Sequence, residues 1–242
     1  MIKKIIKIIL PNKIKKSLIS YKKQIRNFKI LAIEYGQFGT IRNWACIDKN
    51  GNPVPWFTYP TIEYLNCLDL SGCSVFEYGM GYSSLYWLSK TNKVISIEHD
   101  ENWYNKIIMK LSLNNENLTC YLFKNKNEYV SALEKFNQFF DIIVIDGKWR
   151  RKCAESAVRH IKSFGGGMLI FDNSDWYPNT INFLRNELKW IEIDFAGFGP
   201  INNYTWATTI FINPEYRLKY YKNLSSVGGL IQLAEDDQEC TE

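Results

Sequence analysis

The chain has 242 residues, of which 46% are hydrophobic and 15% aromatic. This length and composition allow one α/β domain with extensions, and they exclude a disordered or low-complexity protein. The six cysteines form no C-x-x-C pair and no zinc-ligand spacing, so we expect reduced thiols in a cytoplasmic protein rather than a disulfide framework.

Positive charge is concentrated in residues 1–30. This segment holds ten Lys and Arg residues and no acid, twice the overall net charge of +5, so the rest of the chain is net acidic. Isoleucines and leucines interleave with the lysines, which predicts a basic amphipathic N-terminal extension, helical and broken near Pro11. Such a helix suits an anionic membrane surface, or packing on the domain or a second subunit. It is too short and too charged to span a bilayer.

Residues 31–73 precede the first predicted strand and form a cap or substrate-shaping segment. They include an aromatic, proline-punctuated stretch at 52–61 and then a predicted helix at about 61–68. Tyr59 and Trp56 are candidates for lining a pocket, and aromatic anchoring of this segment to the core is the alternative.

A glycine turn follows the apolar strand predicted at 74–78. An acid, two glycines spaced by one residue and two hydroxyl residues form it: Glu77, Gly79, Gly81, Ser83 and Ser84. Glycine lets the backbone turn tightly and approach a ligand, and the helix that follows offers free N–H groups. The nicotinamide dinucleotide fingerprint needs a third glycine where this chain has Ser84, which disfavours that cofactor.

From residue 74 onward, short β-branched runs alternate with amphipathic helical stretches. We predict strands at 74–78, 94–98, 118–123, 141–146, 167–172, 190–196 and 205–212. We predict the intervening helices at 83–90, 101–113, 128–136, 150–163 and 178–188. This pattern predicts an α/β fold with a doubly wound, mostly parallel seven-stranded sheet that binds ligands at the carboxyl ends of its strands. No helix separates the last two strands, which favours a terminal antiparallel hairpin.

Polar residues end three of these strands. Glu98 ends the second strand, 17 residues after Gly81, where a carboxylate can accept hydrogen bonds from both hydroxyls of a ribose. Capping of the following helix is the alternative role for this acid. Asp146 ends the fourth strand, and Asp172 and Asn173 end the fifth.

The E-x-G-x-G turn, the acid at the end of the second strand and the closing hairpin together resemble class I S-adenosylmethionine (SAM)-dependent methyltransferases, which have a Rossmann-like fold. The resemblance covers roughly residues 60–212 and implies a SAM-binding domain at 74–215, followed by a C-terminal tail at 216–242. It implies SAM as the cofactor, with these residues as its contacts: Glu77, Gly79, Gly81, Ser83, Glu98 and His99.

The residues after the fourth and fifth strands are similar to those of metal-dependent O-methyltransferases. This similarity implies Mg²⁺ as a second cofactor, held by Asp146, Asp172 and Asn173. Lys148 follows Asp146 by two residues, whereas that family places its lysine three residues after the acid. Both residues are candidate catalytic bases. Without a metal, Asp146 would be the base, and Asp172 and Asn173 would orient the acceptor.

The chain also looks like small methyltransferases encoded with bacterial surface-polysaccharide genes. This likeness implies O-methylation of a small-molecule, saccharide or phosphorylated acceptor, with Tyr59, Arg150 and Asp175 as candidate acceptor contacts. The alternatives are a metal-dependent O-methyltransferase of an aromatic or other small molecule, and a non-catalytic interaction protein that keeps the fold. We expect a cytoplasmic enzyme, peripheral at the inner membrane face through residues 1–30, with no nucleic-acid partner.

Overall fold

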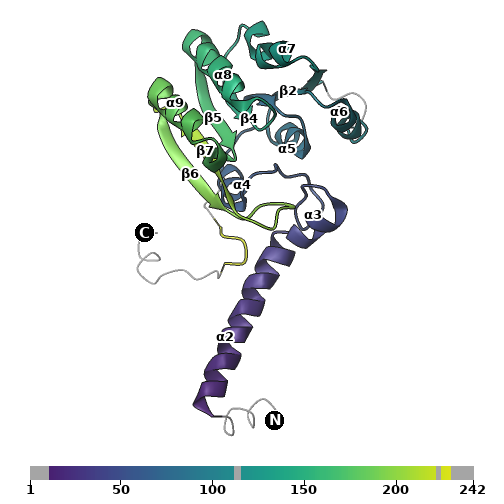
Figure 1. Ribbon diagram of the computed structural model, residues 1–242, viewed down its shortest axis with the longest axis vertical. Helices are drawn as coiled ribbons and strands as arrows, with labels where there is room; N and C mark the ends of the chain where they lie inside the picture. Colours follow the sequence, from purple (N-terminus) through teal and green to yellow (C-terminus); the bar gives the residue numbers. More distant parts are fainter. Residues whose placement is uncertain (1–10, 112–115, 222–224, 230–242) are drawn as a thin grey trace, which may run out of the picture.

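The computed structural model describes residues 11–111, 116–221 and 225–229 (Figure 1). Its centre is one seven-stranded sheet with the strand order β3-β2-β1-β4-β5-β7-β6. The strands are β1 Ser74–Tyr78, β2 Lys93–Glu98, β3 Leu118–Leu122, β4 Phe140–Ile145, β5 Gly166–Asp172, β6 Ile191–Gly197 and β7 Trp206–Ile212. The first five are parallel, and β7 runs antiparallel to both β5 and β6. The predicted fold class is therefore confirmed, and every strand boundary lies within one residue of its predicted position.

Helices cover both faces of the sheet. They are α4 Tyr59–Leu65, α5 Tyr82–Lys90, α6 Glu101–Ile108, α7 Lys126–Val130, α8 Arg150–Phe164 and α9 Pro178–Leu188. Successive strand residues point to opposite faces, so Val75 and Ile142 pack with α4, α5 and α6, whereas Phe76 and Ile143 pack with α7, α8 and α9. Burial on both faces explains the apolar runs without alternation that the sequence shows in β1 and β4.

Three predicted helices differ from the structure in detail. The stretch expected at 101–113 forms α6, which ends at Ile108, and residues 112 and 113 lie outside the described residues. The stretch expected at 128–136 consists of α7 and a separate 3₁₀ turn, η2 Ala132–Lys135. The first of these begins early because Asn125 caps it, with its side-chain oxygen 2.8 Å from the Asn127 nitrogen. Similarly, α4 begins two residues before the predicted start because Pro60 occupies its first turn, where a missing N–H costs nothing.

The N-terminal extension is helical over its described part. Helix α2, Asn12–Lys29, begins directly after Pro11 and continues through a π-turn, η1 Ile30–Glu34, towards α3, Gln37–Asn43. In Figure 1, α2 projects away from the body of the domain as an arm. Within the described ranges no helix is long and apolar enough to cross a membrane. Residues 1–10 of the predicted extension lie outside the described residues.

The first part of the predicted C-terminal tail is attached to the domain. The Asp69 backbone N–H donates to the Lys219 carbonyl at 2.8 Å, and Leu68 forms a β-bridge with Tyr220. Residues 222–224 and 230–242 of the tail lie outside the described residues. The five cysteines that the structure describes are all free thiols, as the sequence predicts.

Candidate functional site

A cavity of about 780 Å³ lies at the carboxyl edge of the sheet. Its walls are the loops after β1, β2, β4 and β5, together with the loop between β6 and β7 and parts of the segment before the sheet. Most of the site residues proposed from sequence line it: Gly79, Gly81, Ser83, Glu98, His99, Asp146, Lys148, Arg150, Asp172 and Asn173. The strand ends thus bring these residues together, as expected for a doubly wound sheet.

The glycine turn touches the loop that follows β4. Gly79 has a φ of 102°, and a Cβ at this position would lie 2.7 Å from the backbone of Gly147. This approach requires glycine at position 79, for both its conformation and its size. The first turn of α5 then faces the cavity through Tyr82 and Ser83. The turn therefore presents a helix N-terminus to any ligand in the cavity.

Glu77 lies beneath the glycine turn and does not line the cavity. Its side chain is fully buried, and Oε2 accepts hydrogen bonds from the Ser84 and Ser96 hydroxyls. Ser84 Oγ in turn accepts from the Gly81 N–H at 3.1 Å. Burial raises the pKa of Glu77, and the hydroxyl groups oppose that shift. Its expected contact with a cofactor is thus replaced by support of the turn, through the serine that distinguishes this turn from a nicotinamide site.

Glu98 lines the cavity, and its two carboxylate oxygens differ in their contacts. Its Oε1 accepts the backbone N–H groups of His99 and Asp100 at 2.7 and 2.8 Å, and His99 Nδ1 lies 2.6 Å from the same oxygen. Within the described residues no group donates to Oε2, although the side chain is only 5% exposed. The hydrogen bonds to Oε1 fix the carboxylate and leave both lone pairs of Oε2 available, which suits a ligand that carries hydroxyl groups.

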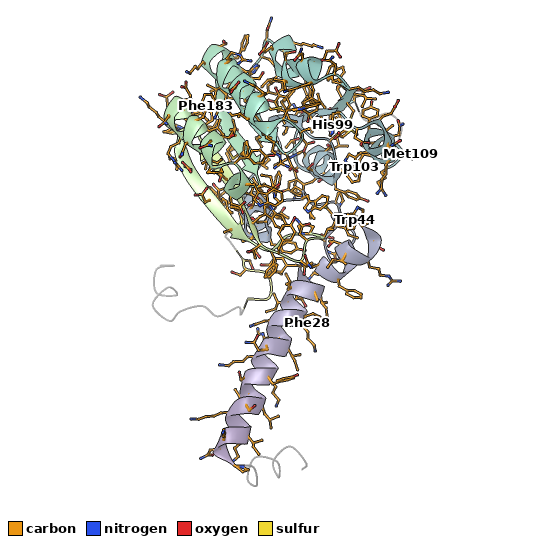
Figure 2. The ribbon with its side chains drawn as sticks, in the orientation of Figure 1. Phe28, Trp44, His99, Trp103, Met109 and Phe183 are labelled. Atoms are coloured by element: carbon orange, nitrogen blue, oxygen red, sulfur yellow. The ribbon has the colours of Figure 1, made fainter. Side chains whose placement is uncertain are left out.

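Helix α6 adds a wall that sequence reasoning missed. Trp103 lines the cavity, and its indole N–H donates to the Met80 carbonyl at 2.6 Å, which joins α6 to the glycine turn. Lys106 lies one turn further along, with Nζ 5.0 Å from the Trp103 ring centre. Their spacing could have indicated this wall, because Trp103 and Lys106 are three residues apart and therefore share one face of the helix that begins shortly after Glu98. Figure 2 shows Trp103 and His99 on the same part of the domain.

Arg150 joins the carboxyl ends of β4 and β5 through all five of its N–H groups. Nε donates to the Gly147 carbonyl, Nη1 to the Asp172 carbonyl and the Asn173 Oδ1, and Nη2 to the Asp146 carbonyl and Oδ1. Arg150 is the first residue of α8, and its side chain is 12% exposed. In this arrangement every donor is used within the protein, so Arg150 has none left for an acceptor, and its predicted acceptor contact stays a prediction.

The predicted Mg²⁺ ligands do not fit a metal ion in this arrangement. Asp146 Oδ1 and Asn173 Oδ1 both accept from Arg150, and Asp172 Oδ2 lies 3.9 Å from Arg150 Nη1. A fixed cation therefore already occupies the centre of the proposed ligand set. The structure describes no group of three or more His, Cys, Asp or Glu residues that could hold a metal ion. The side chains instead form a network around one guanidinium.

Burial raises the pKa of both acids in this network. Asp172 is 2% exposed, and desolvation raises its pKa to about 6, against the opposing effects of Arg150 and the hydrogen bonds from Thr208 and Trp206. Desolvation also raises the pKa of Asp146, and Arg150 again opposes the shift. Among the described residues, nothing donates to Asp146 Oδ2, so this oxygen is available to accept a proton in the cavity.

Aromatic side chains surround the part of the cavity beyond these acids. Trp56, Trp176 and Tyr204 line it, and the latter two are 56% and 45% exposed. Their rings lie 6.2 Å apart. Asn202 lines the same part. Trp56 was expected from the sequence, but Tyr204 and Asn202 were not, because the loop between β6 and β7 reaches the cavity only through the hairpin.

Helix α3 holds that loop in place. The buried Gln37 amide donates to the carbonyls of Gly199 and Asn202 at 3.0 and 3.1 Å, and the Ile201 N–H donates to Thr40 Oγ1 at 2.8 Å. Ile201 has a φ of 66°, which is strained for a β-branched residue. The segment before the sheet therefore shapes the cavity by fixing a strained loop from the opposite end of the chain.

Two predicted acceptor contacts lie outside the cavity lining. Tyr59 is buried and stacks on Tyr35 with ring centres 4.3 Å apart, so it anchors the cap to the core. The Asp175 carboxylate accepts the Ala207 N–H at 3.0 Å, and this residue does not line the cavity. Lys148 does line the cavity, with its Nζ 5.0 Å from the Trp149 ring centre.

Comparison with known proteins adds only distant structural likenesses. No protein-family model and no curated protein matches the sequence. A Streptococcus mutans protein solved with SAH, provisionally described as a methyltransferase, is 13% identical, with a TM-score of 0.46 over 62% of this chain and 94% of that chain. The precorrin 8W decarboxylase of Methanobacterium thermoautotrophicum is 17% identical (TM-score 0.43; 66% and 93%). The N-methyltransferase NodS of Bradyrhizobium japonicum, solved with SAH, is 14% identical (TM-score 0.40; 60% and 80%). At this distance the likenesses identify neither ligand nor reaction.

Proposed function

We propose that this chain is a SAM-dependent methyltransferase. The observation that carries the proposal is the Oε2 of the buried Glu98, to which no described residue donates, in a cavity that the glycine turn, a helix N-terminus and Asp146 also line. The Glu98 carboxylate suits the ribose hydroxyls of SAM, and the helix N-terminus after the glycine turn suits its carboxylate. When bound, SAM supplies an electrophilic methyl group for in-line transfer.

Asp146 is the residue best placed to remove a proton from the acceptor. Asp146 lines the cavity, and no described residue donates to its Oδ2, whereas Oδ1 accepts from Arg150 at 2.8 Å. Desolvation raises its pKa, which moves this carboxylate towards the range where a general base works best. Lys148 lines the cavity and is exposed, so we assign it to contact with a negatively charged part of the acceptor.

The acceptor that fits the outer part of the cavity is a saccharide. Exposed aromatic rings offer flat apolar faces to the C–H groups of a sugar, and the amide of Asn202 offers hydrogen bonds to its hydroxyls. Lys148 suits a phosphate carried by such an acceptor. O-methylation within bacterial surface-glycan biosynthesis is the setting we propose, in line with the sequence resemblance.

A metal-dependent methyltransferase of aromatic hydroxyls is the less favoured alternative. The same aromatic rings would also bind a planar acceptor, but Arg150 takes the place that the metal would need. EDTA separates the two reactions, because it would abolish a magnesium-dependent transfer and leave a metal-free one unchanged.

Calorimetry with S-adenosylhomocysteine tests the cofactor directly. We expect saturable binding to the full-length protein, no competition by NADH, and roughly 10- to 100-fold weaker binding by Glu98→Gln, which removes the charge but keeps the shape. Glu101→Gln is the matched control, because this exposed acid pairs with Lys124 outside the cavity. Equal binding by both variants, or no binding at all, would reject the proposal.

Transfer of tritiated methyl groups from SAM tests the reaction and the acceptor class. The panel contains nucleoside-diphosphate sugars, free oligosaccharides and catechols, each with and without EDTA. We expect label in a saccharide, unaffected by EDTA. Label in a catechol that EDTA abolishes would support the metal-dependent alternative. Binding of the cofactor without transfer to any acceptor would support a non-catalytic interaction protein.

A further inference from the structure

Helix α2 carries an apolar stripe that nothing in the described structure covers. Five large side chains follow one another at alternating spacings of four and three residues, which places them on one face of the helix: Ile14, Leu18, Tyr21, Ile25 and Phe28. Each is between 45% and 70% exposed, and no residue of α2 is buried. The stripe is about 21 Å long at 1.5 Å per residue. Figure 2 shows α2 and its Phe28 below the domain body.

Cations flank this stripe without partners on the helix. α2 holds seven basic residues and no acid, and Lys15, Lys22 and Lys29 recur every seven residues along one edge of the stripe. None of these three lysines forms an ion pair within the described part of the chain. Arg26 makes a single bond, to the Gly228 carbonyl. Within the described structure, the apolar stripe of α2 is therefore exposed to solvent, and no acidic side chain pairs with the three lysines beside it.

We propose that α2 binds flat on an anionic phospholipid membrane surface. The apolar stripe would enter the boundary between headgroups and acyl chains, and the lysines would extend their charged ends to the lipid phosphates while their methylene stems stay on the apolar side. This placement buries the stripe and neutralises the lysines in one step.

Charge complementarity favours this occupant over a second copy of the helix. Pairing two α2 helices along their stripes would bring two sets of seven cations together with no acid on either helix to offset them. An anionic bilayer has the opposite charge and accepts an apolar stripe of any register. The sequence before α2 extends the pattern, since residues 2–10 contain three lysines, six isoleucine or leucine residues and no acid.

This inference is independent of the proposed chemistry. The stripe lies on the projecting arm, and none of its residues lines the cavity. Loss of membrane binding is therefore expected to leave cofactor binding unchanged, and failure of the methyltransferase proposal would leave the membrane measurement valid.

Sedimentation of the full-length protein with vesicles provides the test. We expect binding to vesicles of phosphatidylcholine with phosphatidylglycerol, weak binding to phosphatidylcholine alone, and loss of binding as salt rises. The triple variant K15E/K22E/K29E should weaken binding on the order of a hundredfold or more, from about 1 kcal/mol per basic residue near the surface. The matched variant K13E/K16E/K23E changes the same charge away from that edge and should lose clearly less.

A second pair of variants tests the apolar contact. Leu18→Ser removes a residue of the stripe and should weaken vesicle binding roughly tenfold. Ile19→Ser, at a position that is even more exposed but off the stripe, should have little effect. Circular dichroism and calorimetry with S-adenosylhomocysteine confirm that each variant is folded. Equal binding to neutral and anionic vesicles, or equal effects of the two serine variants, would overturn the proposal. A dimer by light scattering that Leu18→Ser dissociates would assign the stripe to a second copy instead.

Discussion

The two parts of the cavity that we assign to the proposed cofactor and to the proposed acceptor, named below the cofactor half and the acceptor half, are built in different ways. On the cofactor side, the glycine turn and Glu98 follow β1 and β2 directly, and backbone groups of adjacent residues fix them. On the acceptor side, Asp146 follows β4, Asp172 ends β5 and Tyr204 lies in the loop between β6 and β7. Arg150 and α3 hold these parts together. One half is a local structure, and the other exists only after distant parts of the chain have packed.

The halves also differ in electrostatic cost. Glu98 Oε1 accepts hydrogen bonds from two backbone N–H groups. Asp146 and Asp172 are desolvated acids that share one guanidinium, and burial raises the pKa of both. Desolvated acids lower the stability of the fold and supply reactive groups. In the acceptor half we therefore expect residues that serve the reaction at a cost in stability. The following variants test that contrast, from the largest expected effect to the smallest.

Asp146→Asn should separate the two halves most clearly. The amide can still accept from Arg150 through its oxygen but cannot take a proton, so we expect kcat to fall on the order of 10²- to 10⁴-fold. Affinity for S-adenosylhomocysteine should change less than about threefold. The measurements are steady-state kinetics with the acceptor found by label transfer, and calorimetry. An unchanged kcat would remove Asp146 from the chemistry.

Asp172→Asn should change how stability depends on pH. In the folded protein the pKa of Asp172 is raised to about 6 from an ordinary 3.8, so the folded state holds this proton more tightly than the unfolded state. The free energy of unfolding should therefore fall by roughly 3 kcal/mol as pH rises from about 4 to about 6, and stay lowered above that.

The asparagine variant lacks this titration and should not show that part of the fall. It keeps an oxygen for the Trp206 and Thr208 donors. Urea unfolding of both proteins at pH 4, 5, 6 and 7 gives the difference between their stabilities. A difference that stays constant over this range would contradict the raised pKa.

Arg150→Lys tests the guanidinium as the centre of the acceptor half. A lysine cannot reproduce five donors in a planar fork, so carbonyl and amide oxygens after β4 and β5 lose their partners. We expect a loss of about 2 kcal/mol in stability and a fall in kcat, with cofactor affinity almost unchanged. Thermal unfolding with and without Mg²⁺ or EDTA is the measurement. Restoration of the variant by Mg²⁺ would show that a metal site lies beneath the arginine.

Gln37→Ala should give the smallest effect, again on the acceptor side. The variant removes the two hydrogen bonds that hold the loop carrying Asn202 and Tyr204, at a cost of about 1–2 kcal/mol. We expect the KM for the acceptor to rise several-fold while the affinity for S-adenosylhomocysteine stays constant. Gln24→Ala, on the exposed helix α2, is the control. Equal loss of cofactor affinity would mean that the halves are not independent.

Sequence reasoning located the strands and the cofactor half because the signals there are local. Parallel strands buried on both faces leave continuous apolar runs, and the acids and glycines at their ends follow directly in the chain. Gly79 is an example: its φ of 102° and its contact with Gly147 admit no side chain, so the residue type records the backbone requirement. Glu77 shows the limit, because its motif indicated the turn but not that the carboxylate lies underneath it.

The tertiary structure alone decided the acceptor half. Nothing in the residues near Arg150 indicates that its side chain reaches Asn173, 23 positions away. Through this contact Arg150 lies among the residues that the sequence predicts to be metal ligands. Likewise, Tyr59 lies in the core, where it stacks on Tyr35. Tyr204 lines the cavity because α3 binds the loop between β6 and β7, more than 160 residues away in the sequence. The sequence by itself determined the sheet and the groups that follow single strands. Which side chains meet across several loops depends on packing between distant segments, and no local pattern encodes that packing.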